Sequence, residues 1–218
     1  FRNERYLDQD DIDTIVAWVD GGGLKGSDAD MPPPPDFPEG WTYEGGEPDY
    51  VFDLPIEYTV AAEGEEDYID FYSDIPWDED RFAEVLELRP SDYRVVHHSG
   101  AYTVDLPWGT QVIDGVLHDL EGNSLLRAPL PRRPPSETAE ETESTGRVVQ
   151  RVFNEVNLPG SSKLLSYVPG RGVERHRPGT GKRLASDKWI RWTMHYNPIG
   201  VEATERSKLG IWFNKVPV

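Results

Sequence analysis

Residues 8–20, DQDDIDTIVAWVD, have the hydrophobic pattern of one amphipathic helix. The apolar residues recur at helical spacing and would form a single stripe: Ile12, Ile15, Val16 and Val19. Asp8 is suited to cap the first turn, and three glycines beginning at Gly21 end the pattern. Because so short a helix is marginal alone, we expect its stripe to pack against something.

The segment after this helix, from Gly21 to about Gly46, contains a run of prolines: Pro32, Pro33, Pro34 and Pro35. A proline run favours an extended polyproline conformation without a core of its own. We therefore assign residues 1–48 to a helix and a proline-rich arm. The four prolines are candidate contacts for a protein partner.

From Asp49 onward the pattern changes to short segments rich in β-branched and aromatic residues, separated by turn residues. They predict strands near 50–60, 66–73, 82–89, 93–104, 111–117, 147–156, 163–168, 188–197 and 207–213. Such a pattern favours an all-β fold, an antiparallel β-sandwich or jelly roll, over residues 49–218. Residues 118–146 are polar and rich in proline, so we predict a long exposed loop there.

The formal net charge of −18 is spread unevenly along the chain. Residues 1–92 hold 27 acidic and 5 basic side chains, whereas residues 93–218 hold 13 acidic and 17 basic ones. The acidic half argues against nucleic acid or an anionic membrane as the partner. It is either a solubilising surface or a docking face for a basic protein.

Trp108, between Pro107 and Gly109, is a candidate exposed anchor for a partner.

No apolar run is long enough to span a bilayer, so we expect no transmembrane segment in this sequence. Cysteine is absent, which excludes disulfides and thiolate metal ligands. The first residue, Phe1, is not methionine, which either cleavage during export or a partial chain would explain. We expect a periplasmic or extracellular location.

Three of the five histidines lie in two strand-like segments: His97 and His98 in RVVHHSGAYTVDL, and His195 in WIRWTMHYNPIG. Neutral imidazoles are common ligands of copper and zinc, so these three are candidate metal ligands. Neighbouring residues of a regular strand face opposite sides of the sheet. Both His97 and His98 can therefore bind one metal only at a strand end or a bulge, which Ser99 and Gly100 would permit. Otherwise one histidine faces the core and the other faces solvent.

Two parts of the chain resemble known families. LDQDDIDTIVAWVDGGGLKG, continuing to PPPPDFPEGW, is similar to the C-terminal helix and tail of a bacterial c-type cytochrome domain, but without the haem-attachment motif. VVHHSGAYTV, YVPGRGVERHRPGTGKRL, KWIRWTMHYNPIG and TERSKLGIWF resemble, in that order, the N-terminal domain of copper type II ascorbate-dependent monooxygenases of the peptidylglycine α-hydroxylating kind. The resemblance implies a β-sandwich in which His97, His98 and His195 hold one electron-donating copper, and no haem in this chain.

This chain departs from the family at the second copper site, where oxygen is activated. That site uses a His-x-His and a methionine in a second domain, but this chain has no His-x-His, and its only methionines are Met31 and Met194. We therefore assign no catalytic residue and favour a non-catalytic role.

Two functions remain open from the sequence. The first is an exported accessory or scaffold subunit of a larger electron-transfer assembly, photosynthetic or respiratory, that binds protein partners and lies at the periphery of a membrane complex. The second is a mononuclear copper redox protein, or one half of a copper-dependent monooxygenase. A three-histidine zinc site has the same ligands as the copper site.

Overall fold

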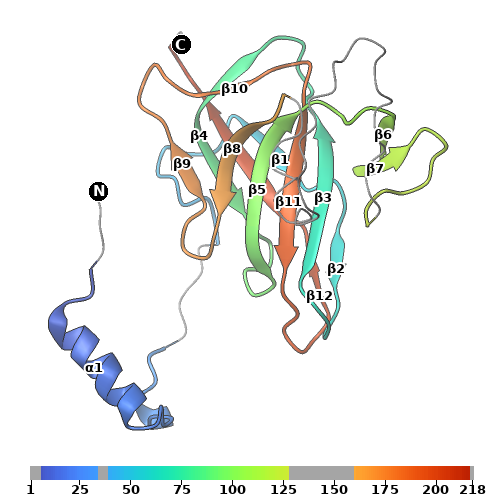
Figure 1. Ribbon diagram of the computed structural model, residues 1–218. Helices are drawn as coiled ribbons and strands as arrows, with labels where there is room; N and C mark the ends of the chain where they lie inside the picture. The colour runs from blue at the N-terminus through green and yellow to red at the C-terminus, as the bar shows by residue number, and fades with distance from the viewer. Residues whose placement is uncertain (1–5, 34–38, 128–159, 217–218) are drawn as a thin grey trace, which may run out of the picture. The chain divides into compact units, whose positions relative to one another are not determined.

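The computed structural model describes residues 6–33, 39–127 and 160–216. Contacts along the backbone divide the chain into two units, Phe1–Phe37 and Pro38–Val218. Each unit is described by itself below, the first as a helix with a following extended segment and the second as a β-sandwich (Figure 1).

Helix α1 (Gln9–Asp20) forms where the hydrophobic pattern predicts it. The Asp8 carboxylate accepts a hydrogen bond of 2.9 Å from the Asp11 amide, which caps the first turn. Gly21 ends the helix and donates its amide hydrogen to the Ala17 carbonyl at 2.9 Å. No residue of α1 is buried. Among the residues described, no helix has the length and hydropathy of a membrane span.

The arm after α1 contains one short 3₁₀ helix, η1 (Asp28–Asp30). Pro32 and Pro33 follow it, exposed and outside regular structure, while Pro34 and Pro35 lie outside the described residues. The predicted partner contacts of these prolines stay a prediction.

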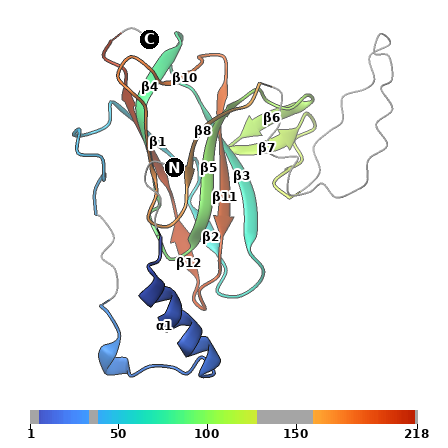
Figure 2. The same ribbon diagram turned by 60° about the vertical axis from the view of Figure 1, so that its left-hand side comes forward.

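Two antiparallel sheets form the layers of the second unit, and its described residues also include two smaller two-stranded pairs. The larger sheet consists, in order, of β1 (Tyr50–Asp53), β13 (Lys208–Phe213), β4 (Arg81–Arg89) and β10 (Lys182–Leu184), with β9 (Val173–Arg175) also paired to β4. The smaller sheet consists, in order, of β3 (Asp67–Asp74), β11 (Trp189–Tyr196), β5 (Val96–Val104) and β8 (Ser162–Tyr167). Figure 2 shows the two layers from the side.

The hydrophobic core lies between these sheets. Phe52, Leu86 and Leu209 project from the larger sheet and belong to one buried cluster with Phe71 and Trp192 from the smaller sheet. Along β11, for example, Ile190, Trp192, Met194 and Tyr196 alternate into this core, as the period-2 pattern requires. The prediction of an all-β antiparallel sandwich preceded by a helix is confirmed.

Several boundaries differ from those predicted. The segment predicted as one strand over 50–60 is divided into β1 and β2 (Tyr58–Val60), because Pro55 lacks the amide hydrogen that a ladder needs. The segment 111–117 is a hairpin of β6 (Thr110–Ile113) and β7 (Val116–Asp119). Its turn residues, Asp114 and Gly115, both have positive φ, as a tight hairpin turn requires.

Three short strands were not predicted: β9, β10 and β12 (Ala203–Glu205), the last paired with β2. Each has three residues, too few to show a period of two. The predicted strand 147–156 lies outside the described residues. Of the predicted loop 118–146, the described part begins with the end of β7 and continues to Arg127, with a bridge between His118 and Ser124.

The outer faces of the two sheets are covered differently. Trp41 and Tyr43 contact Trp212 edge-on over the larger sheet, with ring centroids 5.7 and 5.0 Å apart. On the smaller sheet, Leu117 of the β6–β7 hairpin packs on Tyr72 and Tyr102 at one end. The candidate site lies at the other end of that outer face.

Candidate functional site

The pairing of β5 with β11 brings the three candidate histidines to one place. His98 lies opposite His195, while the next pair joins Val96 to Tyr196, so His97 is an extra residue in β5. This is a β-bulge, in which two residues of one strand oppose one residue of its neighbour. The bulge lies immediately before Ser99 and Gly100. It keeps Val96 in the core while both histidines remain exposed.

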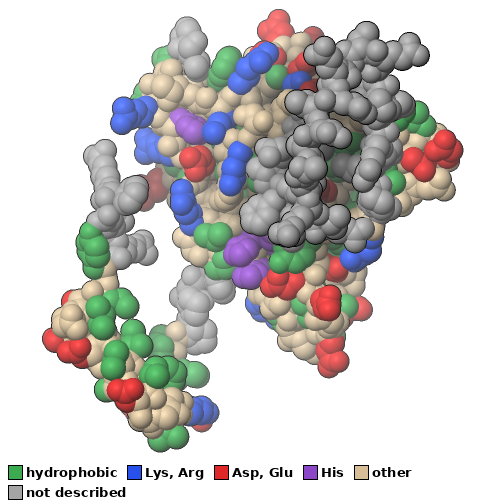
Figure 3. Space-filling model, in the orientation of Figure 1, with side chains coloured by type: hydrophobic (Ala, Val, Ile, Leu, Met, Phe, Trp, Pro, Cys, Tyr) green, Lys and Arg blue, Asp and Glu red, His purple; other side chains and the backbone are tan. Residues whose placement is uncertain are grey.

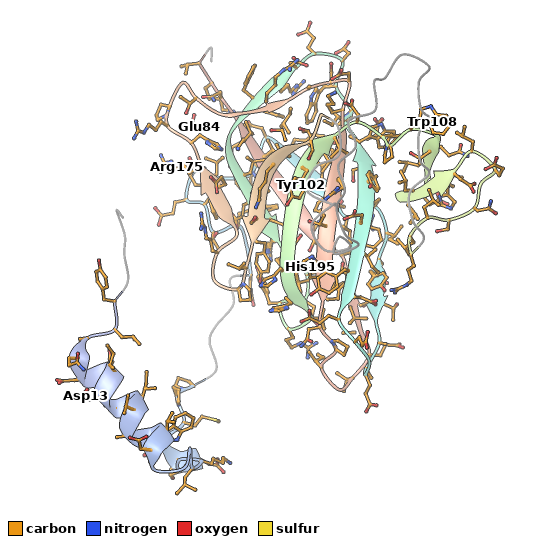
Figure 4. All side chains as sticks on the ribbon, viewed as in Figure 1. Asp13, Glu84, Tyr102, Trp108, Arg175 and His195 are labelled. Atoms are coloured by element: carbon orange, nitrogen blue, oxygen red, sulfur yellow. The ribbon has the colours of Figure 1, made fainter. Side chains whose placement is uncertain are left out.

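The imidazole rings form a cluster on the outer face of the smaller sheet. The rings of His97 and His98 are stacked with centroids 3.9 Å apart, and those of His98 and His195 are 5.9 Å apart. The Tyr68 ring, from β3, is 4.1 Å from the His195 ring. Figure 3 shows histidine side chains gathered at the surface, and Figure 4 shows His195 on the same face as Tyr102.

Glu66 provides the negative charge of this cluster. One carboxylate oxygen lies 2.8 Å from Nδ1 of His97, and the other accepts a hydrogen bond of 2.7 Å from the Tyr68 hydroxyl. The Tyr68 hydrogen bond, supported by the charge of His97, lowers the pKa of Glu66 below its ordinary value. In its neutral form, a His97 ring that donates Nδ1–H to this carboxylate presents the lone pair of Nε2 to solvent or to a metal.

His195 is the most enclosed of the three histidines. Burial lowers its pKa below 6.5, and the neighbouring His98 lowers it further, while Glu66 acts in the opposite direction. His195 is therefore neutral at pH 7, the form in which imidazole binds metals.

The arrangement does not by itself form a complete metal site. Among the described residues, no three His, Cys, Asp or Glu side chains are placed so that they could hold one metal ion. The imidazoles therefore lie side by side without converging on a common point. The structure brings the predicted ligands together, and metal binding by them stays a prediction.

The other predicted residues lie elsewhere. Trp108 is in the loop between β5 and β6, and its side chain is 53% exposed, as predicted (Figure 4). The two remaining histidines, His118 and His176, are both partly buried. His118 is held by a contact of 2.9 Å between its Nδ1 and the Val116 carbonyl oxygen.

Three residues of this face were missed by the sequence reasoning: Glu66, Tyr68 and Arg191. Tyr68 is on the same face as His195 because it lies directly opposite His195 in the ladder. Arg191 is on that face because it is an even number of positions from His195 on β11. That signal becomes visible only once the register of β3 against β11 is known.

Neither models of protein families nor curated proteins give a match to this chain. The resemblance to copper monooxygenases and cytochromes therefore depends on the sequence motifs alone.

Proposed function

We propose that this chain is a non-catalytic, exported accessory subunit that joins an electron-transfer assembly by docking on a protein partner. The observation that carries the proposal is the exposure of α1. Within its own unit the described residues leave the apolar stripe uncovered, with Ile12 40%, Val16 51% and Val19 58% exposed. An amphipathic helix whose apolar face has no partner is the usual form of a segment that binds a groove.

The charge of α1 specifies the chemistry of the partner. The helix and its cap contain five aspartates and no lysine or arginine: Asp8, Asp10, Asp11, Asp13 and Asp20. An apolar groove rimmed by basic side chains would complement both the stripe and these carboxylates. Trp108 and the exposed Pro32 and Pro33 offer further contacts, and the sandwich acts as the scaffold.

The test compares two charge-matched variants in native extracts. Ile12→Asp with Val16→Asp places two carboxylates in the stripe, whereas Thr14→Asp with Ala17→Asp places two on the opposite side of the helix. We expect the wild type and the opposite-face variant to elute as part of a large complex, and the stripe variant to elute as a monomer. A monomeric wild type, or equal behaviour of the two variants, would refute the docking role.

A mononuclear copper protein is the second candidate, supported by the bulge that places His97 and His98 beside His195. Rotation of the imidazole rings about their side-chain torsions would direct three nitrogens at one ion. Copper titration followed by X-ray absorption should then show one copper per chain with imidazole ligands. His195→Ala should abolish this binding, and His118→Ala, away from the site, should retain it. Unchanged copper binding in His195→Ala would exclude this site.

A further inference from the structure

A groove lies on the outer face of the smaller sheet, beside the histidine cluster. It encloses about 260 Å³ over β5, β8 and β11. Gly100 is among its lining residues, and the Tyr102 ring and Thr193 Oγ1 occupy the space in front of it, each 2.9 Å from the place where a Cβ would lie. Tyr102 and Val168 provide apolar surface, and Ser166 lies at the rim. Figure 4 shows Tyr102 and His195 on neighbouring strands of this face.

Arg191, on β11, lines the groove with a guanidinium that lacks a full set of partners. The residue is only 1% exposed, and its Nε has no hydrogen-bond acceptor among the described residues. The Asp70 carboxylate forms an ion pair with Nε, but at 3.7 Å it is beyond hydrogen-bond distance. The guanidinium carbon lies 5.1 Å from the centre of the Tyr102 ring. A buried charged donor without an acceptor is costly, and a bound anion would remove that cost.

The charge of the groove is opposite to that of the chain. The described residues that line it include one arginine, Arg191, and no aspartate or glutamate. The chain as a whole has a formal net charge of −18. A groove of this composition attracts an anion, whereas most of the surface repels one.

We propose that this groove binds a small organic carboxylate with a flat apolar body. The carboxylate accepts hydrogen bonds from Arg191, and the apolar body lies against Tyr102 and Val168. Arginine pairs well with planar carboxylates, and the face of an aromatic ring offers a flat apolar surface. This binding site is independent of the docking role of α1.

The test is a titration of the full chain with benzoate, followed by amide chemical shifts in NMR spectra. Benzamide, which has the same shape without the charge, is the ligand control. We expect benzoate to shift the amides around Gly100 and Arg191, and benzamide to bind about tenfold or more weakly. Shifts confined to other regions, or equal binding of the two probes, would overturn the proposal.

Three variants locate the binding. Arg191→Met removes the cation at similar volume and should weaken benzoate binding about tenfold or more. Ser166→Trp fills the groove from an exposed position and should block binding even if Arg191→Met does not fold. Arg183→Gln is the control, because that arginine pairs with Asp80 on the other sheet. Unchanged affinity in a folded Arg191→Met, or in Ser166→Trp, would refute the site.

Discussion

Glu205 is the most informative single residue outside the candidate site. It is 1% exposed, and its carboxylate accepts hydrogen bonds from Tyr196 Oη at 2.9 Å and Ser207 Oγ at 2.7 Å. The Ser91 amide donates a third at 3.1 Å. These contacts connect β11, β12 and the segment after β4. Burial raises the pKa of Glu205 above 4.5, although the three hydrogen bonds act in the opposite direction.

A raised carboxyl pKa makes the folded state bind the proton more tightly than the unfolded state does. The contribution of Glu205 to stability is therefore complete below the unfolded pKa and is lost as the pH rises through the folded pKa. We would measure the free energy of unfolding in urea at pH values from about 4.5 to about 8. As the pH rises over this range, the free energy of unfolding of the wild type should fall relative to that of Glu205→Gln. Glu202→Gln, at an exposed carboxylate nearby, should follow the wild type. A constant difference between wild type and Glu205→Gln over this range would contradict the prediction.

The local alternation of apolar and polar residues predicted where most strands form, but it did not predict which strands pair. Alternating apolar residues predict the strands that contain His98 and His195 correctly. Their register depends on packing between segments about a hundred positions apart, which no local pattern encodes. The β6–β7 hairpin shows the reverse case, because the Asp114–Gly115 pair was a local turn signal that the sequence reasoning overlooked. Glu66 and Tyr68 joined the site only through β3 pairing with β11.

Gly100 tests how closely β5, β11 and the Tyr102 ring are packed. In Gly100→Val the new side chain would overlap Thr193 Oγ1 and the Tyr102 ring, each 2.9 Å from the position of its Cβ. We expect a loss of about 1–3 kcal/mol in the free energy of unfolding, measured by urea denaturation. Gly40→Val is the matched control, since nothing lies within 4 Å of a Cβ there. Equal stability of the two variants would show that this face repacks freely.

The whole molecule combines a sandwich with its own core and a helical unit without buried residues in α1. The sequence predicted both parts, because a change from helical to alternating periodicity is visible along the chain. The expectation that the stripe of α1 packs against something is not met within its own unit, where no residue of α1 is buried, because such packing depends on tertiary contacts that a local pattern does not encode.

Removal of residues 1–37 should leave the stability of the sandwich nearly unchanged. The core consists of residues from the two sheets and their connections. The truncated chain therefore keeps all of this core, and its unfolding exposes the same buried surface. Urea unfolding should give the same midpoint and the same slope for the full and the truncated chain. A lower midpoint after truncation would mean that the first unit stabilises the second.

The bulge in β5 means that one of the paired histidines is, in effect, a one-residue insertion. If His97 were deleted, Val96 and His98 would be consecutive, with one facing inward and the other outward, as in an unbroken strand. A site of this kind can therefore be gained or lost through a single codon, without rewriting the hydrophobic pattern that folds the sandwich. Chains that differ by one residue at this point could share the same fold and yet differ in their chemistry.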